Sequence, residues 1–199
     1  MKRMLDIFAA AAGLLLLAPL FGAVALMIKL DSQGPIFFRQ KRIGKGFRPF
    51  WIYKFRTMIA GAPAALPLTV GADPRITRVG KFLRRSKIDE LPQLFNILKG
   101  EMTLVGPRPE VPCYVEAFRH DYQEILSMRP GLTDLASLKY RDEEQLLGQS
   151  GHPEEEYLRR VLPDKIRLGK EYIRHSSLLF DLSLIAKTLL KVIFPRSAT

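Results

Sequence analysis

The sequence predicts an α+β fold that is mainly helical, with one small β-hairpin and an N-terminal segment inserted in a membrane as a re-entrant helix. Three observations predict it: an uncharged apolar run near the N-terminus, one pair of aromatic-rich segments around a glycine turn, and several segments with apolar residues at helical spacing. With 199 residues, 47% hydrophobic and 26% charged, the chain can bury one core, and wholesale disorder is excluded.

The chain is strongly basic, and the excess of positive charge is concentrated near the N-terminus. Lys and Arg total 31 against 20 Asp and Glu, a formal net charge of +11. Up to Arg56, ten of these cations face only Asp6 and Asp31. Such a balance indicates an anionic partner, which composition leaves open as nucleic acid, phospholipid headgroups or a phosphorylated substrate.

The uncharged run extends from Ile7 to Ile28. As a straight helix its 22 residues would reach about 33 Å, which is enough to cross a bilayer. A signal peptide with a small-residue cleavage site at 23–25 is one alternative, but it would export the cations that follow, against the positive-inside rule. A spanning helix kinked at its proline is a second alternative.

Pro19 favours a third alternative, in which the helix enters the membrane and returns on the cytoplasmic face. An interior proline removes a backbone hydrogen bond and costs about 3 kcal/mol in an isolated helix. A break there leaves two halves, each long enough for one leaflet and neither for two. Positive charge flanks both ends of the run, which also favours a return to the same side.

Beyond this run the sequence predicts a hairpin, a loop and a series of helices. Strands are expected over 36–43 and 47–55 around the turn Gly44-Lys45-Gly46, and a loop over 60–74 because it holds three prolines and two glycines. Helices are expected at about 78–86, 90–99, 112–127, 153–161, 164–175 and 178–194. The apolar stripe of the last helix suits either core packing or an interfacial position on a membrane.

The segment 75–108 carries the chemistry. The helix expected at 90–99 ends at Gly100, with Asp89 as its N-cap and Pro92 tolerated in its first turn. Asp89 and Glu90 then lie at the positive end of a helix, where the carboxylate of Asp89 is expected to be ionised near neutral pH.

Six cations lie just ahead of this acidic pair: Arg75, Arg78, Lys81, Arg84, Arg85 and Lys87. A helix N-terminus with converging cations is typical of a phosphate site. An acidic pair inside it indicates a divalent cation that bridges carboxylate and phosphate, or a carboxylate nucleophile that attacks phosphorus. A solvated, capped helix start is the simpler alternative. Arg108, held extended between two prolines, adds a rigid guanidinium.

Three runs resemble the bacterial sugar transferase family, the small monotopic polyprenyl-phosphate phosphoglycosyl transferases: YKFRTM at 53–58, DELPQLFNILKGEMTLVGPRP at 89–109, and RPGLT at 129–133. The resemblance covers nearly the whole chain. It implies transfer of a sugar 1-phosphate from a UDP-sugar to polyprenyl phosphate such as undecaprenyl phosphate, with release of UMP, at the start of surface glycan or glycoconjugate synthesis. Localisation on the cytoplasmic face of the bacterial inner membrane is implied as well.

The resemblance also implies roles for individual residues. Asp89 would be the nucleophile that forms a phosphosugar-aspartyl intermediate. Glu90 would be its acid/base or metal-binding partner, with Mg²⁺ on both carboxylates. Lys54 and Arg108 match cations around the phosphates. The chain would consist of residues 1–30 as the re-entrant membrane helix and 31–199 as the cytoplasmic-face catalytic domain, with an interfacial helix at about 178–194.

Two further cations are assigned in the same way: Arg84 to the phosphates and Arg141 to the nucleotide phosphate. The chain departs from the family pattern at Ala18-Pro19, where a Ser-Pro pair is common at the helix break, and at 133–141, a region expected to help define the donor sugar. The competing hypothesis is a non-enzymatic, membrane-anchored basic module that binds anionic lipid or nucleic acid through the hairpin at 39–56. It leaves the acidic pair unexplained, so we expect membrane phospholipid but no nucleic acid as a partner.

Overall fold

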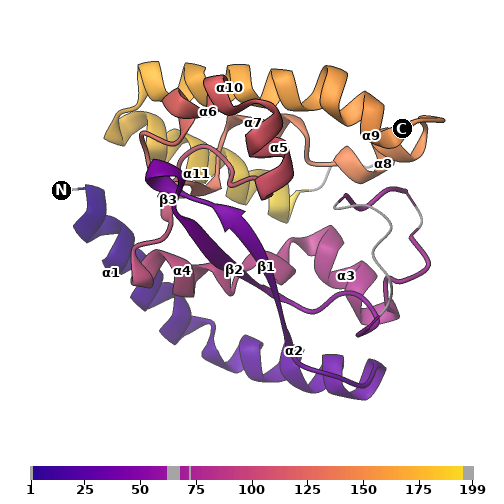
Figure 1. The fold of residues 1–199 in the computed structure, drawn as a ribbon. Helices are drawn as coiled ribbons and strands as arrows, with labels where there is room; N and C mark the ends of the chain where they lie inside the picture. The colour runs from indigo at the N-terminus through magenta and orange to yellow at the C-terminus, as the bar shows by residue number, and fades with distance from the viewer. Residues whose placement is uncertain (1, 62–67, 72, 195–199) are drawn as a thin grey trace.

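The computed structural model describes residues 2–61, 68–71 and 73–194, so part of the loop expected at 60–74 and the last five residues lie outside the described residues. Figure 1 shows the bent helix pair α1 (Lys2–Leu16) and α2 (Ala18–Asp31) along one side of the molecule and α10 (Leu162–His175) along the opposite side. The β-hairpin and the short helices lie between them. A mainly helical fold with small sheets is thereby confirmed.

The other α-helices follow along the chain, and α11 comes after α10. Their bounds are α3 Arg78–Ser86, α4 Gln93–Lys99, α5 Pro112–Ala117, α6 Arg119–Ile125, α7 Leu135–Lys139, α8 Glu143–Gly148, α9 Pro153–Glu156 and α11 Leu178–Ile193. The helix expected at 112–127 is broken at Phe118, whose φ of −120° and ψ of 36° are not helical. The helices expected at 153–161 and 164–175 instead run on continuously through a π-turn at Tyr157–Val161.

The expected hairpin is present. Strands β1 (Phe37–Ile43) and β2 (Pro49–Phe55) pair antiparallel, with Gln40 opposite Ile52. Gly46 supplies the left-handed φ of 64° in the connecting turn. Because side chains alternate along a strand, Lys54 lies on the same face as the buried Ile52. The hairpin thus carries Lys54 at the end of its inward face.

A second sheet, which sequence analysis did not predict, joins β3 (Thr103–Val105) and β4 (Gly131–Thr133) in parallel. The RPGLT run at 129–133 supplies β4. A Cβ atom added to Gly131 would lie 2.1 Å from the backbone nitrogen of Gly106, so only glycine allows the two backbones to approach this closely. This approach fixes the segment 106–109, which carries Arg108, against the chain at 129–134.

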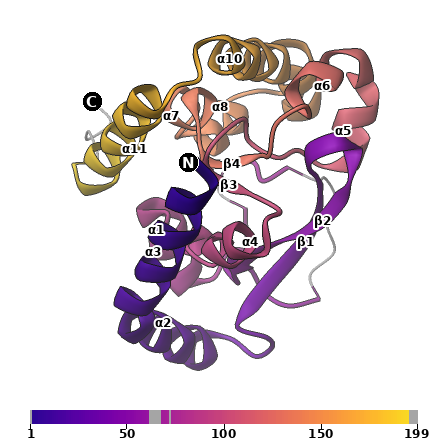
Figure 2. The ribbon, with the colours of Figure 1, turned by 90° about the vertical axis from the view of Figure 1, so that its left-hand side faces the viewer.

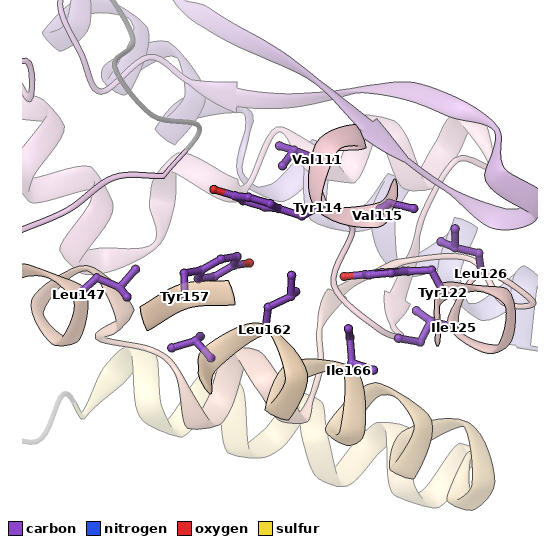
Figure 3. Packing of buried hydrophobic residues seen from close by; sticks show 11 residues of the cluster. Val111, Tyr114, Val115, Tyr122, Ile125, Leu126, Leu147, Tyr157, Leu162 and Ile166 are labelled. Atoms are coloured by element: carbon purple, nitrogen blue, oxygen red, sulfur yellow. The ribbon is translucent and has the colours of Figure 1, made fainter. Parts of the chain in front are cut away.

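The largest core cluster lies between α5, α6 and α10 (Figure 3). The ring centroids of Tyr114 and Tyr157 lie 5.1 Å apart, with Leu162 of α10 next to Tyr157, and Ile166 of the same helix lies below Tyr122. A second cluster joins α1, α4 and β2 through residues that include Ala10 and Ile97. The N-terminal helix is therefore packed against the rest of the chain.

Buried polar contacts tie the start of α1 to the centre of the fold. The ammonium of Lys2 forms an ion pair with Asp181 of α11 at 2.8 Å. The buried carboxylate of Asp6 accepts a hydrogen bond from the hydroxyl of Thr103 at 2.5 Å. Figure 2 shows α1, α11 and β3 lying near one another at this end of the molecule.

The end of α2 is also held. The carboxylate of Asp31 accepts a hydrogen bond from the backbone N–H of Val79 at 3.2 Å, and Arg56 donates to the carbonyl of Ser32 at 2.7 Å. Within the described residues no single helix is long and apolar enough to cross a membrane, whereas α1 and α2 together meet those criteria as a pair bent by 60°. Pro19 lies in the first turn of α2, where a backbone N–H has no intrahelical partner to lose.

Helix α11 places its apolar residues on two sides. Leu184 is fully buried and lies in a cluster with Val105 and Tyr172. Leu179 and Leu190, by contrast, are 80% and 57% exposed. The apolar stripe expected to be one face is therefore divided between the core and the surface.

The contact between Gly106 and Gly131 makes Gly131→Ala strongly destabilising. The added Cβ would force the two backbones apart, and overpacking of this kind costs about 2 kcal/mol or more. Gly151→Ala is the matched control, because a Cβ there meets nothing within 4 Å and the change should stay within about 0.5 kcal/mol. Unfolding free energies of the detergent-solubilised proteins check this, and equal stability of the two variants would contradict it.

Candidate active site

The acidic pair lies in a short 3₁₀ turn, Ile88–Glu90, between α3 and α4. The expectation that Asp89 caps a helix is wrong. Lys87, with a left-handed φ of 58°, ends α3, and the chain turns so tightly that the next helical turn starts at once. Asp89 is the middle residue of that turn, its side chain caps no backbone N–H, and α4 begins only at Gln93.

Glu90 is the centre of an ion-pair cluster built from three segments. Its Oε1 lies 2.8 Å from the ammonium of Lys54 on β2, and Arg108 donates to both of its oxygens, with 3.2 Å between Nη1 and Oε2. Burial by itself would raise the pKa of Glu90, but the charges of Arg108 and Lys54 outweigh burial and hold this pKa well below its usual 4.5. Glu90 is thus an anion that keeps two cations in place.

Asp89 has the opposite environment. It is 5% exposed, and its Oδ1 is buried without a hydrogen-bond partner. Burial raises the pKa of Asp89 to about 6, assisted by the negative charge of Glu90 and opposed by the nearby cations, with Lys54 first. The carboxylate is therefore ionised for the most part at neutral pH, but it is much less stabilised as an anion than a helix N-cap would be.

The backbone on either side of Arg108 restricts the position of this residue. The two flanking prolines restrict its conformation, and its backbone N–H donates to Oδ2 of Asp134 at 3.1 Å. The other oxygen of Asp134 caps α7 by accepting from the backbone N–H of Ser137 at 2.7 Å. Sequence reasoning missed Asp134 as a residue of the site, although an Asp immediately before a helical run is a typical cap signal.

The remaining two predicted cations lie farther out. Arg84 pairs with Glu144 and donates to the hydroxyl of Thr57 at 3.3 Å, while its charge still lowers the pKa of Asp89. The guanidinium of Arg141 donates instead to the carbonyl of Lys191 near the end of α11. Only its backbone carbonyl faces the site, where it accepts from the ammonium of Lys87 at 3.3 Å.

The donor set fits a Mg²⁺ ion held partly by substrate. Among residues 2–61, 68–71 and 73–194, no group of three or more Asp, Glu, His or Cys side chains could hold a metal ion by itself. Neither carboxylate oxygen of Asp89 accepts a hydrogen bond from the described residues, whereas both oxygens of Glu90 already face cations. Mg²⁺ commonly takes one or two carboxylates and completes its shell with water and phosphate oxygens.

Removing the charge of Glu90 should destabilise the fold. Glu90→Gln leaves Lys54 and Arg108 largely buried without their counter-ion, a change that costs roughly 3 kcal/mol for such clusters. Glu144→Gln, which removes the half-exposed partner of Arg84, should cost less than about 1 kcal/mol. Denaturant titration in detergent measures the free energy of unfolding of both variants. A smaller loss for Glu90→Gln than for Glu144→Gln would contradict the prediction that the ion-pair cluster of Glu90 stabilises the fold.

Comparison with known proteins places this site in a family. A sequence model described as "Bacterial sugar transferase" matches residues 1–195. The chain is 41% identical over 205 residues to "Undecaprenyl-phosphate glucose phosphotransferase" of Komagataeibacter xylinus, covering 99% of the chain and 36% of that protein. It is 39% identical over 194 residues to "UDP-N-acetylgalactosamine-undecaprenyl-phosphate N-acetylgalactosaminephosphotransferase" of Aeromonas hydrophila, covering 94% of the chain and 42% of that protein.

A third relative is closer in length. The chain is 43% identical over 192 residues to "UDP-glucose:undecaprenyl-phosphate glucose-1-phosphate transferase" of Caulobacter vibrioides, covering 94% of the chain and 67% of that protein. The chain therefore spans well under half the length of the first two relatives and about two thirds of the third. The names of these relatives differ in the sugar and agree on undecaprenyl phosphate. With a match over almost its entire length, the chain belongs to the bacterial sugar transferase family.

Proposed function

We propose that this chain is a phosphoglycosyl transferase, which moves a sugar 1-phosphate from a UDP-sugar to polyprenyl phosphate, releases UMP and so initiates a surface glycan or glycoconjugate. One observation carries the proposal: a buried acidic pair in which Glu90 binds Lys54 and Arg108 while an oxygen of Asp89 has no partner. The printed names of the relatives support the substrate classes. A basic module that only binds lipid or nucleic acid has no need of this arrangement.

The chemistry would proceed in two displacements at one phosphorus. A carboxylate oxygen of Asp89 attacks the sugar-bearing phosphorus, the bond from that phosphorus to UMP breaks, and UMP leaves with the electron pair. An oxygen of polyprenyl phosphate then attacks the same phosphorus, the bond to Asp89 breaks, and the carboxylate is restored. One site thereby serves a soluble donor and a lipid acceptor in turn.

Charge neutralisation would be the main contribution of the other residues. Arg108 and Lys54 lie where they can stabilise negative charge on the phosphoryl group, and Glu90 holds both in position. Because these cations hold the pKa of Glu90 low, Glu90 would position them and would not act as an acid or base. Mg²⁺, bound by Asp89 with Glu90 next to it, would neutralise further phosphate charge.

The N-terminal helix pair would enter the membrane and return. Lys2 and Asp6 contact Asp181 and Thr103, and the end of α2 is held through Asp31, so both ends of the pair are bound to the same folded body. A body on one side of a bilayer cannot hold both ends of a helix that crosses about 30 Å of hydrocarbon. We place that body on the cytoplasmic face of the bacterial inner membrane, where the flanking cations favour it.

Exposed apolar side chains support this arrangement. Phe8 and Leu16 of α1 are 75% and 79% exposed, and Leu30 of α2 is 79% exposed. Leu179 and Leu190 of α11 are exposed as well. Large apolar side chains in such numbers suit contact with lipid, with α11 lying in the interface.

The covalent step can be detected directly. Incubation with UDP-sugar and Mg²⁺ but without lipid should add the mass of a sugar phosphate to a peptide that contains Asp89, because the carboxylate has no acceptor to which it can pass the group. Asp89→Asn should abolish both this adduct and UMP release, since an amide is a far poorer nucleophile. Intact-protein and peptide mass spectrometry check it. Substantial turnover by Asp89→Asn would exclude the covalent mechanism, and a panel of UDP-sugars in the same assay identifies the donor.

The topology can be tested with single cysteines. With Cys113 replaced by Ser, probes at positions 3 and 33 should both resist a membrane-impermeant thiol reagent in intact cells and both react after lysis. Pro19→Leu should straighten part of the population, since the substituted residue has a backbone N–H that can donate within a continuous helix. Labelling of the position 3 probe alone in the otherwise unchanged protein would establish a spanning helix instead.

A further inference from the structure

Gln93, the first residue of α4, has a buried side chain with an unmet hydrogen-bonding capacity. It is completely buried, yet neither Nε2 nor Oε1 of its amide has a hydrogen-bond partner. Leaving a buried amide unpaired is unfavourable, and the great majority of such groups in folded proteins are paired. An unpaired buried amide beside a reactive group therefore requires an explanation.

Gln93 follows Asp89 closely along the chain. Leu94 donates its backbone N–H to the carbonyl of Leu91, and Phe95 donates to that of Pro92, so tight i→i−3 turns connect the 3₁₀ turn of Asp89 to α4. Helical side chains lean towards the N-terminus of their helix. The turn on the N-terminal side of α4 is the one that carries Asp89.

A second buried amide on the same helix shows what a structural role looks like. Asn96 accepts from the backbone N–H of Tyr53 at 3.0 Å and donates to the carbonyl of Trp51 and the carboxylate of Glu101, both at 2.7 Å. It joins α4 to the hairpin and leaves nothing unpaired. Gln93 lies one turn away and has no such contact, so its amide does not hold the elements together.

Gln93 and Asp89 present complementary unpaired atoms. Oδ1 of Asp89 is a buried acceptor without a donor, and Nε2 of Gln93 is a buried donor without an acceptor. Gln has three rotatable side-chain bonds, so a rotamer change without backbone movement could bring the two together. We propose that Gln93 is a positioning residue for Asp89, donating its Nε2–H to Oδ1 while the other carboxylate oxygen reacts; this inference rests on the proposed function.

The consequence for the two displacements is unequal. While the sugar phosphate is on the reacting oxygen of Asp89, Oδ1 is the carbonyl oxygen of a mixed anhydride. When polyprenyl phosphate attacks phosphorus, the bond from phosphorus to Asp89 breaks and negative charge returns to both carboxylate oxygens. A donor on Oδ1 stabilises that developing charge, so Gln93 should assist the second displacement more than the first.

The test compares Gln93→Met with the neighbouring control Leu94→Met. Met fills the space of Gln without a polar atom, so the fold should be as stable as in the unchanged protein or more so, since an unpaired amide is removed. The adduct should still form from UDP-sugar, but its transfer to added polyprenyl phosphate should slow by roughly 10- to 100-fold, the loss expected for a hydrogen bond to a charged group. Leu94→Met, a volume-conserving change at a buried position, should alter neither rate.

Rapid-quench mass spectrometry follows both steps, and thermal unfolding reports stability. The inference would be overturned if Gln93→Met transferred the sugar phosphate to lipid at the unchanged rate. It would also be overturned if adduct formation and transfer slowed equally and the melting temperature fell, because that result indicates a structural role. Failure of the proposed function has a different signature, because the unchanged protein would then form no adduct. If the unchanged protein releases UMP but forms no adduct, the overall turnover of Gln93→Met is compared with that of the unchanged protein, and equal turnover overturns the inference. If the unchanged protein neither forms an adduct nor releases UMP, both proposals are overturned.

Discussion

The carboxylate of Glu90 is the point at which the structure is held together around its site. It binds Lys54 of the hairpin and Arg108 of the segment after β3, so three segments separated along the chain meet at one charge. Two largely buried cations without this anion would repel each other and lose hydration. The hairpin, the 3₁₀ turn and the segment around Arg108 therefore have to fold as one unit.

The two neighbouring acids have opposite environments, which suits the different roles that we propose for them. Glu90 is fully engaged and its pKa is low, whereas burial raises the pKa of Asp89 and leaves one of its oxygens unpaired. A group that must form and break a bond to phosphorus is useful only if it is not already satisfied by the protein. Gln93 shares this incompletely paired environment, which is unfavourable for stability and suited to a changing charge on Asp89.

Apolar packing attaches α1 to the folded body, and polar contacts set its orientation. Apolar packing tolerates many orientations of a helix, but the bond from Thr103 to the buried Asp6 and the ion pair of Lys2 with Asp181 are specific in direction and length. They fix which end of α1 meets the folded body. The apolar faces of the same helix are thereby left exposed, where lipid would cover them.

The sequence by itself determined the features that depend on residues close together along the chain. These are the helix at 78–86, the hairpin strands, the end of α4 at Gly100, and the charged surroundings of the acidic pair. Tertiary structure decided the rest. The parallel pairing of β3 with β4 depends on the approach of Gly106 to Gly131, and the guanidinium of Arg141 turns towards α11 rather than the site. The opposite pKa shifts of Asp89 and Glu90 likewise depend on Lys54 and Arg108, which are remote in sequence and pair with Glu90. Spacing along a chain encodes periodicity, whereas burial and pairing depend on which distant segments come together in the folded molecule.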